Sequence, residues 1–376
     1  MRFLERERAE LERLLPGLDA VLAGARLEDL ERPGNAGLAA FREAGGPGLL
    51  VPTEHQGAGA DLLAAVRVQR AIGSRSPSLA VATTMHHFSV ASLVETSATG
   101  NGMEWMLLAA IAQDGLLLAS GFAEGRTGQH ILSPGLTARV EGEKVWLSGS
   151  KKPCSLARSM NLLTASVALP ADDGGTRLAV ALVPADAPGV SVRPFWNSPV
   201  LAGAESDEVV LDDVEVPAEL IVRTGVTSEG DLDHLQTVGF VWFELLMTAS
   251  YLGAASALVE RVLAVDKVDP ALRASVLADL DAAVLAVEGL ARAATAEGPD
   301  NDTLARSLTC RFHAQDVITS VAGRCVEALG GMAFIGSGDV AYLNSACRAL
   351  AFHPPSRARM ATALLEHAAG EPLRVP

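Results

Sequence analysis

A block of short alternating segments in the middle of the chain constrains its fold more than any other feature. Between about Leu116 and Val222, valine-rich runs alternate apolar and polar side chains, and turn-forming residues separate them. A period of two predicts β-strands. The close spacing leaves no room for crossover helices, so we expect an antiparallel barrel or sandwich. The runs are LTARVEG, KVWLSG, NLLTASVAL, RLAVALVP, VSVRP and DEVVLDDVEVP.

Helical patterns lie on both sides of this block, because apolar residues recur there every three or four positions. We therefore predict an α+β protein with an N-terminal helical domain (1–118), a middle β domain (119–225) and a C-terminal four-helix bundle (226–376). The helix candidates are Leu27–Ala44, Leu62–Ile72, Met103–Gln113, Val238–Val265, Leu272–Ala294, Leu304–Leu329 and Arg357–Ala369.

Charge and cysteine content narrow the classes of function. The formal net charge of -15 argues against nucleic acid or an anionic membrane as the main partner. The N-terminal segment is charged and lacks the apolar core of a secretion signal, which predicts a cytoplasmic protein. The cysteines lack the spacing of a metal site or a disulfide framework, so we expect reduced thiols and no metal. They are Cys154, Cys310, Cys325 and Cys347.

One apolar run, Val238–Leu258, approaches the length of a membrane span. Glu244 interrupts it, and small residues recur along it. A helix that is apolar on every side also suits the centre of a large bundle. We therefore expect a buried helix and no membrane partner.

The stretch from Gly121 to Ser155 carries a family resemblance. Its loop GFAEGRTGQH, its SGSK turn and its PCS end follow the order and spacing of the flavin-binding segment of acyl-CoA dehydrogenases. The segments GLLVPTEHQGAGADLLAAVRVQRAIG, SDEVVLDDVEVP and RFHAQDVITSVAGRCVEALGGMAF are similar to further stretches of that family. The likeness covers roughly residues 35–365 and implies the family's order of a helical domain, a β domain and a helical bundle.

The resemblance implies FAD as the cofactor and a homodimer or homotetramer as the assembly. Pro153 stands where the family usually places a tryptophan against the flavin, and the Arg-x-x-Phe-Gly motif that contacts a neighbouring subunit's cofactor is missing. FMN, or no flavin at all, therefore stays open. The implied cofactor residues are Phe122, Glu124, Gly128, Gln129 and Ser155 around the ring and loop, and Gly330 and Gly331 at the diphosphate.

The expected reaction is α,β-dehydrogenation of a small-molecule or carrier-bound acyl thioester, which needs a carboxylate base. The family's usual Glu-Gly-Thr run corresponds here to Pro354–Ser356, which offers no carboxylate. Some members place the base on a helix of the C-terminal domain. Glu244 lies within one residue of that position, and a buried carboxylate there would have the raised pKa that suits a base. The other reading of Glu244 is a buried ion pair with an arginine.

Histidines support an alternative reaction. His86 and His87 lie in TTMHHFSV, and His353 lies beside the position of the missing base. Flavin monooxygenases of the same fold often keep histidines near these places and a serine near the flavin, and they need no carboxylate base. The alternatives to dehydrogenation are therefore a flavin-dependent monooxygenase and a non-catalytic, flavin-free homologue.

Overall fold

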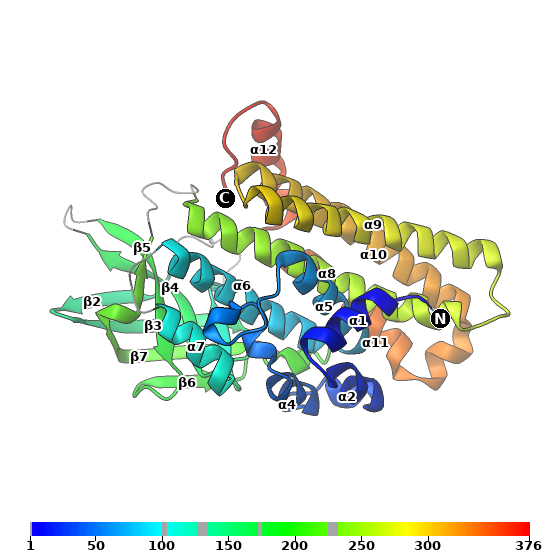
Figure 1. The fold of residues 1–376 in the computed structure, drawn as a ribbon, viewed down its shortest axis with the longest axis horizontal. Helices are drawn as coiled ribbons and strands as arrows, with labels where there is room; N and C mark the ends of the chain where they lie inside the picture. Colours follow the sequence, from blue (N-terminus) through cyan, green and yellow to red (C-terminus); the bar gives the residue numbers. More distant parts are fainter. Residues whose placement is uncertain (1, 100–103, 126–133, 172–174, 225–231) are drawn as a thin grey trace.

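The computed structural model describes residues 2–99, 104–125, 134–171, 175–224 and 232–376. Helices come first along the chain, strands follow, and long helices end it. Figure 1 shows the strands gathered at one end of the molecule, with α8, α9 and α10 extending away from them. The predicted α+β class is confirmed.

One of the predicted N-terminal helices is interrupted, and a further helix over Pro77–Thr99 was not predicted. The expected helix over Leu27–Ala44 is divided into two, because Pro33 and Gly34 interrupt it and the Asn35 side chain caps the second piece by accepting from the backbone N–H of Gly37. The elements are α1 (Glu5–Leu14), α2 (Leu18–Gly24), α3 (Leu27–Leu30), α4 (Ala36–Glu43), η1 (Gly46–Gly48), η2 (Thr53–His55), α5 (Leu62–Arg75), α6 (Pro77–Thr99) and α7 (Glu104–Asp114).

The middle strands form one eight-stranded sheet in the order β6-β7-β3-β2-β4-β5-β8, with β1 paired to β4. The pairing is antiparallel except for β1 with β4 and β2 with β4, which are parallel. The strands are β1 (Leu118–Gly121), β2 (Thr137–Glu141), β3 (Lys144–Cys154), β4 (Leu162–Pro170), β5 (Thr176–Pro184), β6 (Val190–Arg193), β7 (Asp207–Pro217) and β8 (Ile221–Arg223), with η3 (Ala202–Ala204) and η4 (Ala218–Leu220) beside β7.

The C-terminal helices pack around α8, which contacts α5, α6, α9 and α10. By length and composition alone, α8 and α10 could each cross a membrane; the apolar window of α8 is 89% buried inside the protein and that of α10 is 22% buried. The elements are α8 (His234–Leu263), α9 (Pro270–Glu297), α10 (Asn301–Gly336), α11 (Gly338–Ala346), η5 (Ala349–Phe352) and α12 (Arg357–Ala368).

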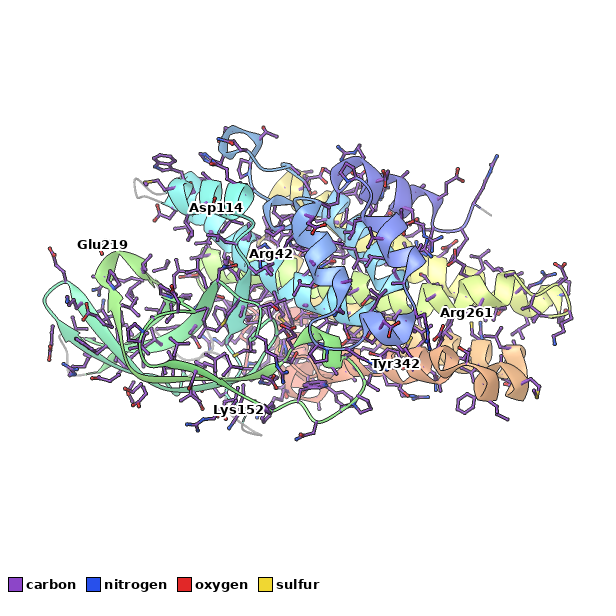
Figure 2. The ribbon with its side chains drawn as sticks, turned by 90° about the horizontal axis from the view of Figure 1, so that it is seen from below. Arg42, Asp114, Lys152, Glu219, Arg261 and Tyr342 are labelled. Atoms are coloured by element: carbon purple, nitrogen blue, oxygen red, sulfur yellow. The ribbon has the colours of Figure 1, made fainter. Side chains whose placement is uncertain are left out.

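Two glycines set how closely α5 and α8 approach. A Cβ at Gly73 would lie 2.2 Å from the carbonyl oxygen of Ser250, and a Cβ at Gly253 would lie 2.4 Å from that of Arg70. Only glycine permits such backbone contact. This crossing holds the middle of α8, which carries Tyr251, in the core between the N-terminal helices and the C-terminal bundle. In Figure 2, Tyr342 and Arg261 lie toward the helical part of the molecule and Lys152 lies in the sheet.

Candidate active site

The loop after β1 is fastened to the end of β3. The Ala123 carbonyl accepts from the backbone N–H of Lys152 at 3.0 Å. The buried Lys151 ammonium donates to the Glu124 carboxylate and, at 2.9 Å, to the Ser166 hydroxyl. Burial lowers the pKa of Lys151, and Glu124 acts in the opposite direction. This clamp fixes the chain directly after Phe122; Gly128 and Gln129 lie outside the described residues.

Ser155 lies just after β3 and forms a buried hydroxyl pair. Its Oγ is 2.9 Å from Oγ of Ser206, and both side chains are almost fully buried. Each hydroxyl has one proton. One of the two hydroxyls donates its proton to the other oxygen, and the proton of the second hydroxyl remains available to an acceptor. Among the described residues neither hydroxyl has a further partner. The pair therefore has the donor that an acceptor atom of a flavin ring would need.

A continuous set of aromatic contacts connects this loop to the C-terminal helices. Phe122 lies 5.8 Å from Phe88 on α6, and Phe88 lies 5.7 Å edge-on from Phe243 on α8, measured between ring centroids. Phe243 in turn lies 6.3 Å edge-on from His353. The rings bring the predicted Phe122 and His353 into one cluster. Sequence reasoning did not single out Phe88, because α6 is apolar on every side and its phenylalanine has no distinguishing pattern.

His353 follows η5 and is held at both its ring and its backbone. Nε2 lies 2.8 Å from the Tyr251 hydroxyl, which comes from the middle of α8. The Arg311 guanidinium of α10 donates to the carbonyls of His353 at 2.9 Å, Pro354 at 3.3 Å and Pro355. Burial, helped by the Arg311 charge, holds the pKa of His353 well below its usual range. The imidazole is therefore neutral at pH 7.

Glu244 forms a buried ion pair with the same arginine. Nη1 of Arg311 lies 2.9 Å and 2.8 Å from the two carboxylate oxygens, and neither side chain is exposed. Burial raises the pKa of Glu244, whereas Arg311 acts to lower it. Both carboxylate oxygens of Glu244 thus accept hydrogen bonds from Arg311, and a proton taken up by Glu244 as a base would have to displace one of these bonds.

The two histidines of α6 lie in different surroundings from His353. Nδ1 of His86 accepts from the backbone N–H of Leu118 at 3.1 Å, so Nε2 carries the proton and donates to the Pro47 carbonyl at 2.9 Å. Burial lowers the pKa of His86 to about 4. His87 is fully buried against Phe41, and neither of its nitrogens has a hydrogen-bond partner among the described residues. Neither imidazole joins the ring cluster.

Gly330 interrupts α10 with a positive φ of 78° and a ψ of 170°. A Cβ at Gly330 or Gly331 would meet nothing within 4 Å. The paired glycines therefore face open space in this single chain. In the described part of the chain, no group of three or more His, Cys, Asp or Glu residues could hold a metal ion, and all four cysteines are free.

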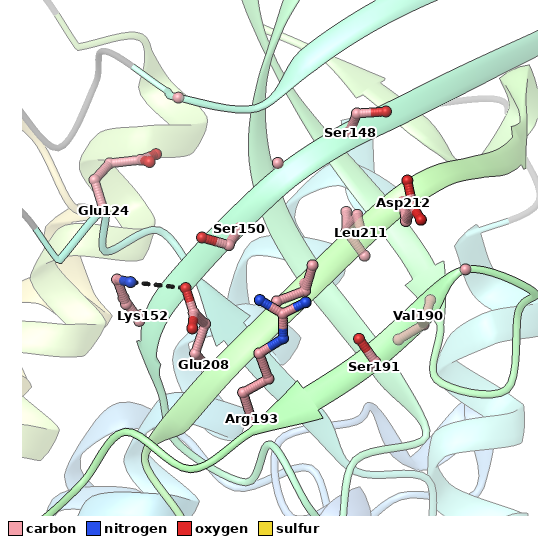
Figure 3. Close-up of a pocket in the computed structure, with 14 residues that line it drawn as sticks. Glu124, Ser148, Ser150, Lys152, Val190, Ser191, Arg193, Glu208, Leu211 and Asp212 are labelled. Carbon is pink, nitrogen blue, oxygen red and sulfur yellow. Dashed lines mark hydrogen bonds and ion pairs between the residues drawn. The ribbon is translucent and has the colours of Figure 1, made fainter.

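An open groove of about 810 Å³ crosses the outer face of β3, β7 and β6 and reaches Glu124. Figure 3 shows Lys152 paired with Glu208 beside Arg193, and the Lys152–Glu208 contact measures 2.7 Å. The lining mixes both signs of charge with serine hydroxyls. The groove thus adjoins the loop of Phe122 and Glu124 but is separate from the rings.

Comparisons with known proteins place the chain in a family. It is 48% identical to an isobutylamine N-hydroxylase of Streptomyces viridifaciens over 378 residues, which cover all of both chains. It is also 27% identical to a probable acyl-CoA dehydrogenase, YngJ, of Bacillus subtilis over 206 residues, 51% of each chain. The chain belongs to the acyl-CoA dehydrogenase superfamily. No protein-family model matches it.

Solved structures show the same fold. KijD3, in complex with FMN and a dTDP-linked amino-keto sugar, superposes with a TM-score of 0.85 at 20% identity, covering 96% of this chain and 93% of that one. A nitrososynthase from Micromonospora carbonacea var. africana superposes with a TM-score of 0.83 at 22% identity, covering 96% of each chain. The predicted superfamily and its fold are confirmed.

The predicted acyl-thioester dehydrogenation is wrong. A relative that matches over its whole length is an N-hydroxylase, and the similar structures include a nitrososynthase. The coarser prediction of an oxidoreductase is confirmed by these relatives. Of the two readings of Glu244, the structure shows the buried ion pair: Arg311, which is distant in sequence, occupies the carboxylate that dehydrogenation would need as a base.

Proposed function

We propose that the protein is a flavin-dependent N-hydroxylase of a small primary amine. The observation that carries the proposal is the 48% identity with isobutylamine N-hydroxylase along both whole chains. The ion pair between Glu244 and Arg311 agrees with it, since hydroxylation at nitrogen needs no carboxylate to remove a proton from carbon. The balance is R–NH₂ + O₂ + reduced flavin (FlH₂) → R–NHOH + H₂O + oxidised flavin.

The residues present fit a flavin at the edge of the sheet. The unshared O–H of the Ser155–Ser206 pair supplies a buried donor, and the clamped loop with Phe122 supplies a wall beside it. When bound and reduced, the flavin supplies the two electrons that activate dioxygen. The missing adenine-contact motif, and the FMN in KijD3, support a site that does not require the adenine half of FAD.

The chain's own residues would shape the amine site. The rings of Phe88 and Phe243 offer an apolar surface suited to a short aliphatic group, and they exclude water from it. The neutral His353 lies against Phe243 and carries the cluster's titratable group. An apolar, uncharged site favours the free amine over the ammonium ion, and only the free amine has the lone pair that attacks oxygen.

Self-association and location belong to the same proposal. Beyond Gly330, Met332 and Ile335 are 80% and 79% exposed, and Phe334 is 47% exposed. Such an apolar surface on α10 supports a homodimer or homotetramer that covers it. A cytoplasmic enzyme without nucleic-acid or membrane partners remains our prediction.

The test supplies chemically reduced flavin, ¹⁸O₂ and isobutylamine to the purified protein. We expect N-hydroxyisobutylamine that carries one ¹⁸O atom, detected by mass spectrometry. Parallel reactions with FMN and FAD should both give product. Failure to oxidise any short primary amine while the protein binds flavin would overturn the proposal, and failure to bind flavin would favour the non-catalytic homologue.

A further inference from the structure

Tyr251 on α8 and His353 after η5 form a hydrogen-bonded pair. Nε2 of His353 lies 2.8 Å from the Tyr251 hydroxyl, and the two ring centroids lie 5.5 Å apart. Tyr251 is only 1% exposed. Among the described residues, its hydroxyl has no second partner, and Nδ1 of His353 has none at all. The pair is thus an isolated two-member system with one free ring nitrogen.

This isolation decides which atom carries the proton. If Nε2–H of His353 donated to Tyr251, the buried phenol proton would have no acceptor among the described residues, and an unmet buried donor costs about 1–3 kcal/mol. If the phenol donates to Nε2, the phenol proton and the Nε2 lone pair are both paired, and the imidazole proton lies on Nδ1. The second arrangement is the more stable. His353 is only partly buried, and Nδ1 has no hydrogen-bond partner among the described residues, so its N–H can meet a ligand.

We propose that Tyr251 is a positioning residue that holds His353 in the Nδ1–H form, so that His353 donates a hydrogen bond into the active site instead of acting as a base. Its role in catalysis rests on the proposed function. Burial raises the pKa of Tyr251 and lowers that of His353, so both groups stay neutral through the physiological range. The donated hydrogen bond suits an oxygen atom that gains negative charge as dioxygen is split.

The helix that carries Tyr251 also fixes the backbone of His353. Glu244 and Tyr251 are seven residues apart on α8, so they share one face of the helix. Glu244 anchors Arg311, and Arg311 binds the carbonyls of His353, Pro354 and Pro355. One face of α8 therefore sets both the position of the His353 backbone and the orientation of its ring.

The first measurement is the tautomer itself, read from ¹⁵N NMR of histidine-labelled protein without flavin. We expect wild-type His353 to show a protonated Nδ1 and an unprotonated Nε2. Tyr251→Phe should move the proton to Nε2, the form that imidazole prefers in water. Tyr342→Phe is the matched control, since this second tyrosine bonds Glu31 and the Leu201 backbone instead. A wild-type proton on Nε2, or no change in Tyr251→Phe, would overturn the inference.

The second measurement separates positioning from folding. Tyr251→Phe should bind the amine with unchanged affinity. The yield of hydroxylamine per reduced flavin should fall about tenfold, because one hydrogen bond to the developing negative charge is lost. Hydrogen peroxide should form in place of the lost product. An unchanged yield would contradict the catalytic part. If the wild-type protein shows the Nδ1–H tautomer yet oxidises no amine, the proposed function fails and the assignment of the proton stands.

Discussion

His86 and His353 are the same residue type in two regions of one molecule, with opposite surroundings. Both nitrogens of His86 are bound to backbone atoms, at 3.1 Å from Leu118 and 2.9 Å from Pro47, and join β1 to the segment before α5. His353 has one nitrogen on Tyr251 and the other free. A histidine with both nitrogens engaged holds the fold together. One with a free nitrogen, beside an aromatic cluster, can still act on a ligand.

The largest expected effect tests how much the buried Arg311–Glu244 ion pair, which holds the His353 backbone, stabilises the fold. Arg311→Met leaves Glu244 buried without its partner, which typically costs about 3–5 kcal/mol of unfolding free energy. Arg306→Met, which breaks the exposed pair with Asp302, should cost about 1 kcal/mol or less. Urea denaturation measures both. A loss for Arg311→Met no greater than that for Arg306→Met would show that the anchor is dispensable.

A pH series tests the His86 region. The pKa of His86 is about 4 in the folded protein, below the 6.5 of a free histidine, so the unfolded chain binds its proton first as pH falls. Its stabilising contribution is complete above pH 6.5 and is lost by pH 4, a change of about 3 kcal/mol. His86→Leu should make stability fall less steeply over this window. Equal slopes for variant and wild type would contradict a neutral, structural His86.

Replacing each histidine with glutamine tests whether His353 serves turnover and His86 serves stability. His353→Gln should lower turnover about 100-fold, the scale of one lost hydrogen bond to developing negative charge, with the amine affinity kept. His86→Gln should lower the melting temperature while folded molecules keep their turnover number. Steady-state assays and thermal unfolding on the same preparations measure both. The comparison fails if His86→Gln abolishes turnover in protein that is still folded.

The smallest expected effect concerns the flavin side of the ring cluster. Ser155→Ala removes one hydroxyl of the Ser155–Ser206 pair, and we expect flavin affinity to fall about fivefold, near 1 kcal/mol. Ser191→Ala, on the outer groove, is the control and should leave the affinity unchanged. Flavin fluorescence titration measures both. Equal dissociation constants for Ser155→Ala and the wild type would place the flavin elsewhere.

Much of the architecture could be predicted because its signals are local. Alternation over LTARVEG and KVWLSG became β2 and β3, and the apolar run around Glu244 became the buried α8. The strands β1 and β8 were not predicted, because the four residues of β1 are all buried and show no alternation, and β8 has only three residues. Helix α6 was not predicted either, because it has no distinct polar face and so shows no helical periodicity of apolar residues.

The sequence by itself determined the superfamily, the order of helices and strands, and the short set of residues that could carry chemistry. Only the tertiary structure decided what those residues do. Glu244 and Arg311 are 67 positions apart, and Tyr251 and His353 are 102 apart. The charge state of a carboxylate and the tautomer of an imidazole depend on the nearest partner in space, and no local pattern records which distant residue that will be.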